Sequence, residues 1–154
     1  MFGTKLRGTI GNDMLTGTVN DDTIYGGAGN DFVFGGGGDD FIYGGAGNDY
    51  LYGGDGNDWI VAGAGRDQMH GGNGADAFVF FKTPYDRDTV MDFRADQGDY
   101  INFVGAISPR EITYHDTDLG IVIQYGGMNG NAENHSEILL LNVHELQSNS
   151  IFIG

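Results

Sequence analysis

The sequence predicts an all-β fold: a parallel β-roll of nonapeptide repeats, capped at its C-terminal end by an antiparallel β region. Three observations predict this class. Glycine is abundant, at 29 of 154 residues. An aspartate returns every nine residues over about half of the chain, and an apolar residue follows two positions after each one. A short, strict period of this kind is typical of solenoids, in which each repeat stacks on its neighbours.

The period divides the chain into three parts. Residues 1–7 form a short N-terminal lead-in, residues 8–79 hold the repeats, and residues 80–154 follow them. Cutting the chain every nine residues from Gly8 aligns eight units without a gap, from GTIGNDMLT to GGNGADAFV. The sixth position is always aspartate, at Asp13, Asp22, Asp31, Asp40, Asp49, Asp58, Asp67 and Asp76. The eighth is always apolar, at Leu15, Ile24, Val33, Ile42, Leu51, Ile60, Met69 and Phe78.

Each unit is expected to form a six-residue turn followed by a three-residue strand. Glycine supplies the positive φ angles that a tight turn needs, and the apolar residue points inward. Two units make one coil, so the turns of alternate units stack on the same edge of the roll. Neighbouring aspartates along an edge then lie roughly 5 Å apart, where two carboxylates repel by about 3 kcal/mol at an effective dielectric near 20. The stack therefore requires cations.

Ca²⁺ fits this requirement, because it takes carboxylate and backbone carbonyl oxygens in flexible geometry. Eight turns leave three gaps on each edge, so the sequence predicts about four to six ions. The four interior gaps are the firmest, because Thr18 and Asn20 replace glycine near the start and Ala62 opens the seventh unit. The alternative, a disordered glycine-rich linker, is expected for the calcium-free chain. The expected metal-binding turns use the eight aspartates and Gly26, Gly27, Gly29, Gly35, Gly36, Gly38, Gly44, Gly45, Gly47, Gly53, Gly54, Gly56, Gly63, Gly65, Gly71, Gly72 and Gly74.

The units resemble the nonapeptide G-G-x-G-x-D-x-U-x of RTX, or hemolysin-type, calcium-binding proteins. The units GGAGNDFVF, GGAGNDYLY and GGDGNDWIV fit every defined position. The following segments GADAFVF and DTVMDFRADQGDYINFVGA resemble the C-terminal part of serralysin-type metalloproteases, and R-modules of mannuronan epimerases have a related layout. The resemblance implies a secreted, extracellular protein. It also implies an uncleaved type I secretion signal in the C-terminal region. Such signals end in a short apolar stretch, and the segment SIFI resembles that stretch.

Composition excludes several other classes of protein. A net charge of −15 disfavours binding to nucleic acid or an anionic membrane surface. The chain has no cysteine, so it forms neither a disulfide nor a zinc–thiolate site. The N-terminal sequence lacks an apolar h-region, and no apolar run approaches ~18 residues, so neither a cleaved signal peptide nor a membrane span is expected.

The region 80–154 alternates apolar and polar residues in several short runs, which predict a β-sandwich-like cap on the end of the roll. Asp88, Asp92 and Asp99 form either another calcium site beside the roll or ordinary turn caps. Unpaired faces and edges of the roll make self-association plausible.

Large aromatic residues alternate with the inward positions and are expected to point outward. Phe32, Phe34, Tyr50 and Tyr52 would lie on one sheet, and Tyr25, Phe41, Tyr43 and Trp59 on the other. Three interpretations remain for these rings: burial under the C-terminal strands or a neighbouring domain, a sugar- or partner-binding face, or simple cross-strand ladders.

The sequence predicts no enzyme, because the serralysin-type zinc helix has no counterpart here and the aspartate pairs face metal. Three functions remain open. The first is a calcium-binding structural and secretion module of a secreted bacterial-type protein, folded by external calcium. A covalently linked catalytic domain or a polysaccharide is a candidate partner. The second is a calcium-dependent module that binds a polysaccharide, such as alginate, or a cell surface. The third is an enzyme or an accessory subunit that tunes one.

Overall fold

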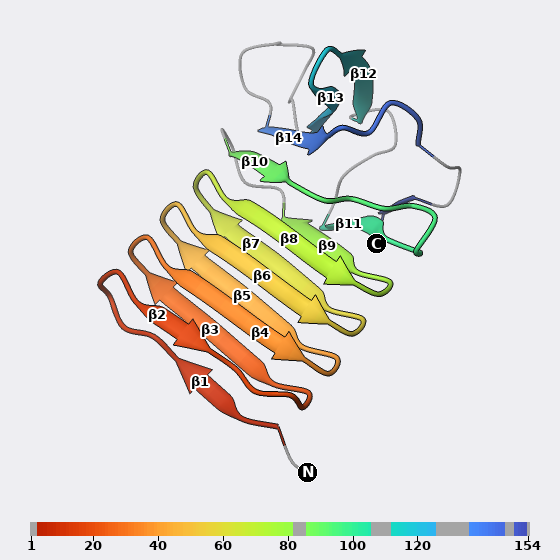
Figure 1. Ribbon diagram of the computed structural model, residues 1–154. Coiled ribbons are helices and arrows are strands. Elements are labelled where there is room, and N and C mark those ends of the chain that lie inside the picture. Colours follow the sequence, from red (N-terminus) through yellow and green to blue (C-terminus); the bar gives the residue numbers. More distant parts are fainter. Residues whose placement is uncertain (1–2, 82–85, 106–111, 126–135, 147–149, 154) are drawn as a thin grey trace.

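The computed structural model describes residues 3–81, 86–105, 112–125, 136–146 and 150–153. The chain winds as a flattened coil between two β-sheets, and the N-terminus lies at the far end from the last strands (Figure 1). Sheet 1 has seven strands in the order β1-β3-β5-β7-β9-β11-β15, and sheet 2 has eight in the order β12-β13-β14-β10-β8-β6-β4-β2. Successive units therefore alternate between the sheets, as the nine-residue period predicts.

The strands of sheet 1 are β1 (Lys5–Arg7), β3 (Thr23–Ala28), β5 (Phe41–Ala46), β7 (Trp59–Ala64), β9 (Ala77–Phe81), β11 (Tyr100–Val104) and β15 (Ile151–Ile153). Those of sheet 2 are β2 (Met14–Thr16), β4 (Phe32–Gly37), β6 (Tyr50–Asp55), β8 (Gln68–Asn73), β10 (Arg87–Val90), β12 (Thr113–Thr117), β13 (Gly120–Tyr125) and β14 (Ser136–Leu141). From β1 to β9 the neighbours within each sheet pair in parallel, and each residue faces the one 18 positions later.

The eighth position of each unit builds the core between the two sheets. Seven of the eight predicted apolar residues, from Ile24 to Phe78, have no exposed surface, which confirms the expected inward direction. Leu15 is half-buried because it lies in β2, the terminal strand of its sheet. Beyond the repeats, Val90, Ile101 and Phe103 continue the same buried cluster without a break.

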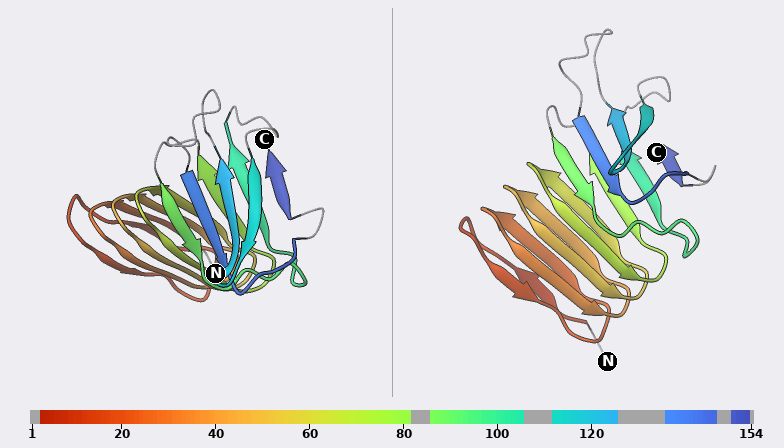
Figure 2. Two further views of the ribbon diagram at one scale, coloured as in Figure 1. Left: turned by 90° about the horizontal axis from the view of Figure 1, so that it is seen from above. Right: turned by 45° about the horizontal axis from the view of Figure 1, so that its top comes forward.

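The C-terminal cap begins as one more coil of the roll. Strands β10 and β11 pair in parallel with β8 and β9, and β15 pairs in parallel with β11. The predicted antiparallel region consists of β12, β13 and β14, which extend sheet 2 beyond β10. Figure 2 shows these strands prolonging the roll at its end. The nine-residue phase missed this coil because its aspartates follow their partners by 21 and 23 residues instead of 18.

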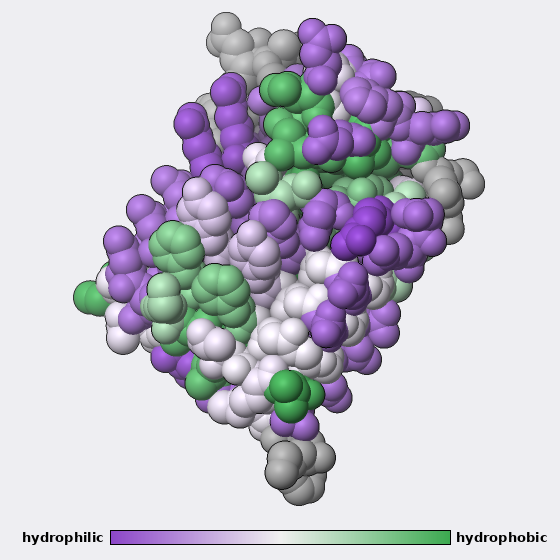
Figure 3. Space-filling view, in the orientation of Figure 1, coloured by the Kyte–Doolittle hydropathy of each residue, from purple (hydrophilic) through white to green (hydrophobic). Residues whose placement is uncertain are grey.

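The outward rings lie on the two sheets as the repeat phase predicts, but the two faces differ. On sheet 2 the rings stack along the roll: Phe32 on Tyr50 with centroids 4.9 Å apart, and Phe34 on Tyr52 with centroids 5.4 Å apart. Figure 3 shows a small hydrophobic patch over β2 and β4 on this face. On sheet 1, the rings of Phe41 and Tyr43 pack against a second buried cluster of Val61, Ala77 and Val79. The described C-terminal strands extend the sheets edge to edge.

Candidate calcium sites between the turns

Two columns of aspartates follow the two edges of the roll. Column 1 contains Asp13, Asp31, Asp49 and Asp67, and column 2 contains Asp22, Asp40, Asp58 and Asp76. In each column, the backbone N–H of one aspartate donates to Oδ1 of the aspartate 18 residues later, at 2.7–2.9 Å. All but Asp13 are at most 2% exposed. The turns thus hold each carboxylate against the turn before it.

Glycine carbonyls converge on the same gaps between turns. A Cβ built on Gly26 would lie 2.3 Å from the carbonyl oxygen of Gly44 and 2.7 Å from Asp31 Oδ2. A Cβ on Gly45 would lie 2.0 Å from the carbonyl oxygen of Gly27, and Gly45 has a φ of 116°. Each interior gap therefore gathers carboxylate and carbonyl oxygens from two turns, where only glycine leaves room.

Six carboxylate oxygens in these columns are buried and accept no hydrogen bond from any described residue. They are Oδ2 of Asp31, Asp40, Asp49, Asp58, Asp67 and Asp76. A buried carboxylate oxygen without a partner is strongly unfavourable. Buried, negatively charged oxygens beside opposed carbonyls are the ligands that Ca²⁺ prefers, so the residues present fit this ion.

The first turn of each column is closed by threonine instead. The N–H and Oγ1 of Thr9 donate to Asp13 Oδ2 at 2.6 and 2.9 Å, and those of Thr18 donate to Asp22 Oδ2 at 2.5 and 3.0 Å. In the regular units the second position is a glycine with positive φ, as in Gly27 and Gly36. The prediction that the first gaps are weak therefore has a physical reason.

The electrostatics of the columns favour a cation. Burial, followed by repulsion from neighbouring carboxylates, raises the pKa of Asp40 and Asp49 to about 6. The same causes raise the pKa of Asp58 and Asp67 to about 7. Asp22 is the exception: burial raises its pKa, but hydrogen bonds from Thr4 and Thr18 outweigh burial and lower it. The ionised form of these interior carboxylates is therefore unfavourable, and a bound cation would stabilise it.

Both columns continue beyond the repeats. Asp67 N–H donates to Asp88 Oδ1 at 3.0 Å, and Asp76 N–H donates to Asp99 Oδ1 at 3.1 Å. Asp88 therefore extends column 1, and Asp99 extends column 2. Asp92 lies with the second column, where its carboxylate accepts hydrogen bonds from the N–H groups of Gly71 and Gly72 at 2.9 and 3.1 Å. The structure does not bring these three aspartates to one point.

The residues that the structure describes contain no group of three or more His, Asp or Glu side chains placed to hold a metal together. Any ion between the turns would therefore take two carboxylates and complete its shell with backbone oxygens. The same residues form no helix long and apolar enough to cross a membrane.

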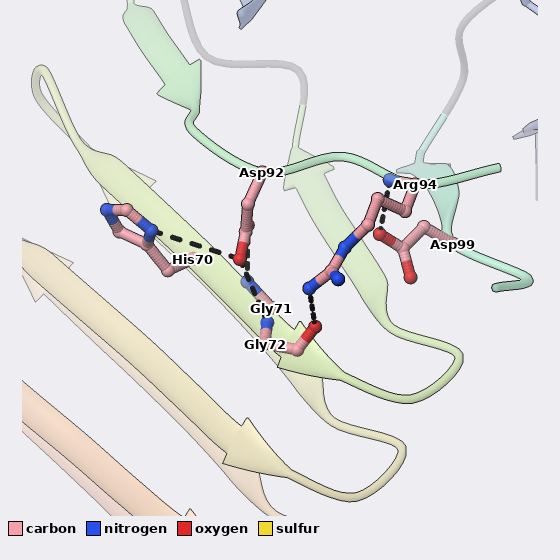
Figure 4. A network of polar contacts seen from close by, with 6 residues as sticks. All are labelled: His70, Gly71, Gly72, Asp92, Arg94 and Asp99. Carbon is pink, nitrogen blue, oxygen red and sulfur yellow. Dashed lines mark hydrogen bonds and ion pairs between the residues drawn. The ribbon is translucent and has the colours of Figure 1, made fainter. Parts of the chain in front are cut away.

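Sequence reasoning missed two features of this site. The first is a column at the fifth position of the units, where the side chain of Asn30 accepts from Asn48 N–H at 2.8 Å and that of Asp39 accepts from Asn57 N–H at 2.7 Å. Recurrent Asn or Asp at this position was the available signal. The second is Arg94, whose guanidinium donates to the carbonyl oxygen of Gly72 (Figure 4). No repeat position marks it.

Comparison with known proteins places these turns among characterised repeats. Residues 7–42 and 43–78 match the family model described as the RTX calcium-binding nonapeptide repeat, in four copies. No curated protein matches the chain significantly in sequence.

Three solved structures resemble the chain. The AlgE6R3 subunit of the Azotobacter vinelandii mannuronan C5-epimerase is 28% identical, with a TM-score of 0.55, and the alignment covers 94% of this chain and 79% of that one. The AlgE6R2 subunit of the same enzyme is 24% identical over 90% and 91% of the two chains, with a TM-score of 0.49. The extracellular lipase LipA of Serratia marcescens is 16% identical over 100% and 40%, with a TM-score of 0.41.

Proposed function

We propose, from the premise that residues 7–78 belong to the RTX calcium-binding nonapeptide repeat family, that the protein is a structural module whose roll is completed by calcium between its turns. The six buried, unpartnered Oδ2 oxygens carry this proposal. Calcium would turn the repulsion along each column into shared coordination. The module itself would hold no catalytic site.

Five gaps are proposed to take one ion each. Each gap lies between two stacked turns, and the turn that comes first in the sequence ends at an aspartate whose Oδ2 is buried. None of these Oδ2 atoms has a hydrogen-bond donor among the described residues. The aspartates are Asp31, Asp40, Asp49, Asp58 and Asp67. The first gap of each column is already filled by threonine donors. The fifth ion would lie between the turns of Asp67 and Asp88, beyond the residues that match the family model.

Calcium binding is proposed to drive folding. The ions bind gaps that exist only when the turns are stacked, so binding free energy adds to the stability of the folded state. Each site contributes about 4 kcal/mol when free calcium is 1,000 times its Kd. A chain of this kind would remain unfolded in a low-calcium cytoplasm and fold in millimolar external calcium.

A calcium titration followed by circular dichroism tests this proposal. We expect a coil-to-β transition at millimolar calcium. The same concentration of magnesium should give none, because Mg²⁺ demands a near-ideal octahedron and gives up its water ligands reluctantly. Native mass spectrometry should count five bound ions. Absence of the transition would overturn the proposal.

Asp49→Asn provides the site-specific test. Replacing one carboxylate oxygen by an amide should remove one or two bound ions, because Asp49 faces the gap above and the gap below. Asp96→Asn is the matched control, since Asp96 is exposed in a turn outside the columns. An unchanged ion count in Asp49→Asn would contradict assignment of the ions to the columns.

Export by a type I route is proposed for the chain, with the signal in the C-terminal region 80–154. Support comes from the resemblance of the segment SIFI to such signals. It also comes from the proposed dependence of folding on calcium, which would keep the chain unfolded until it is outside the cell. Deleting residues 151–154, which include β15, should abolish export from a host carrying a type I exporter. Normal export of the deletion variant would contradict this location.

A second candidate is calcium-dependent binding of a polysaccharide, alone or beside a catalytic domain. It is favoured by the similarity to a subunit of an epimerase that acts on mannuronan. The stacked rings of sheet 2 give it little support, because each ring already presents one face to its stacking partner. Trp59, which is 38% exposed on sheet 1, is the best candidate contact. A glycan array with calcium, comparing wild type with Trp59→Ala, tests this function.

A further inference from the structure

The last gap of column 2 is built differently from the interior gaps. It lies between the turn that ends at Asp76 and the turn that ends at Asp99. A Cβ on Gly35 or Gly53 would have a carbonyl oxygen of the next turn among its three nearest atoms, at 2.6 Å in both cases. On Gly71 the three nearest atoms all belong to Asp76, at 2.2–2.9 Å. In the last gap, therefore, no carbonyl of the next turn approaches this position as closely as the 2.6 Å found at Gly35 and Gly53.

Arg94 reaches into this gap from the segment after β10. Its guanidinium donates to the carbonyl oxygen of Gly72. In the interior gaps the matching carbonyl, such as that of Gly54, lies 2.1 Å from a Cβ built on the next turn. The guanidinium thus takes one of the oxygens that would otherwise remain for an ion (Figure 4).

Neighbouring contacts hold Arg94 in this position. The backbone N–H of Arg94 donates to Asp99 Oδ2 at 2.7 Å. Two residues earlier, the Asp92 carboxylate is fixed by the N–H groups of Gly71 and Gly72. The chain is therefore attached to the last repeat turn on one side of Arg94 and to Asp99 on the other.

Charge at this gap is also complementary. Within the described residues, Arg94 Nε is buried without a hydrogen-bond partner, as is Asp76 Oδ2. A guanidinium is always charged and is less strongly hydrated than an ammonium, so it suits a partly buried position between carboxylates.

We infer that Arg94 is a built-in cation that replaces calcium in the last gap of column 2. Column 1 ends differently: the arginine beside Asp88, Arg87, is 63% exposed and directs Nε towards Glu137 at 3.5 Å. The two edges of the roll therefore end in different cations, calcium at Asp67 and Asp88 and a guanidinium at Asp76 and Asp99. This inference rests on the proposed calcium function.

Arg94→Gln in the full chain tests the inference by native mass spectrometry at saturating calcium. Removal of the positive charge should raise the number of bound ions by one relative to wild type. Arg94→Lys, which keeps the charge, should leave the number unchanged. The double variant Arg94→Gln with Asp76→Asn should lose the added ion. A folded Arg94→Gln variant with the wild-type ion count would overturn the inference.

Asp76→Asn on the wild-type background keeps the test decisive if Arg94→Gln does not fold. Asp49 separates two calcium gaps, whereas Asp76 borders one calcium gap and the Arg94 gap. Asp76→Asn should therefore lose at most one ion, and the loss of two ions would overturn the role of Arg94. If Asp49→Asn loses no ion, the proposed function fails instead, so the two failures are distinguishable.

Discussion

The second residue of each unit decides whether the aspartate Oδ2 of that turn is left without a donor or accepts hydrogen bonds from its own turn. With glycine at positive φ, the turn leaves its aspartate Oδ2 without a donor, as at Asp31. With Thr9 or Thr18 at this position, the backbone N–H and the hydroxyl both donate to that oxygen. One side chain thus gives the Oδ2 oxygen two hydrogen bonds where a glycine leaves it open to the proposed calcium ion.

Gly36→Ala should disrupt its turn, whereas Gly37→Ala should be tolerated. Gly36 has a φ of 115°, and an added Cβ would lie 2.1 Å from the carbonyl oxygen of Thr18. The left-handed conformation alone costs an L-residue about 1–2 kcal/mol, and the collision adds to this cost. At Gly37 the nearest atoms are 3.8 Å away, so alanine should change stability by less than about 1 kcal/mol. Chemical denaturation at saturating calcium measures both, and equal effects would contradict the argument.

The aspartate columns could be predicted from the sequence because phase alone places residues 18 positions apart on one edge. Arg94 could not, since it lies outside the period and its role depends on where the next turn folds back. The replacement of glycine by Thr9 was visible as a departure from the repeat. Its effect on Asp13 was not, because that effect depends on the direction in which the backbone N–H of Thr9 points.

Among the elements, the strands of sheet 2 carry rings that stabilise one another. Tyr52 stacks on Phe34 on one side and on His70, 4.1 Å away, on the other. Parallel strands in register bring identical positions about 4.8 Å apart, which is near the separation of stacked rings. The ladder interpretation of these outward rings therefore accounts for sheet 2 better than a sugar-stacking surface does.

A double-mutant cycle on Phe32 and Tyr50 should measure this stacking. Their rings are parallel within 4°, and both side chains are partly exposed. Truncating each to alanine, alone and together, should give a coupling free energy of about 0.5–1.5 kcal/mol in calcium-saturated unfolding. As a control, Phe32 with the distant Trp59 on sheet 1 should show additive effects. Zero coupling for the stacked pair would contradict the ladder.

In the C-terminal cap, the nine-residue period no longer predicts how the strands pair. Runs of alternating residues correctly indicated strands after the repeats, and β12–β14 are antiparallel as expected. The parallel pairing of β10 and β11 was not expected, because longer turns precede Asp88 and Asp99 and move them out of phase. The division between roll and cap at residue 79 stays a prediction, while the buried core runs through it.

For the whole molecule, the folded calcium-free chain must hold its acidic columns against their own repulsion. The net charge is −15. Burial and neighbouring carboxylates raise the pKa of Asp88 to about 8, above the interior aspartates at about 6 to 7. Protons and the proposed calcium ions would therefore compete for the same oxygens.

The calcium-free chain should be more folded near pH 5 than at pH 8. An unfolded aspartate has a pKa near 3.9, so between about pH 4 and 8 the folded state binds more protons than the unfolded state. Folded stability then falls as pH rises through this window. Circular dichroism in a calcium chelator at both pH values measures this difference. With calcium present, the folded fraction should instead rise with pH. A calcium-free chain that is more folded at pH 8 than at pH 5 would contradict this prediction.

Because units alternate between two sheets, the length of the roll and the relative orientation of its two ends change in steps. Duplicating 18 residues adds one coil, which moves the two ends apart by one strand spacing of about 4.8 Å and keeps their relative orientation. Duplicating nine residues instead turns one end by half a revolution about the roll axis. Unequal recombination between repeats would therefore adjust how far apart, and in which direction, two attached parts of a longer protein are held.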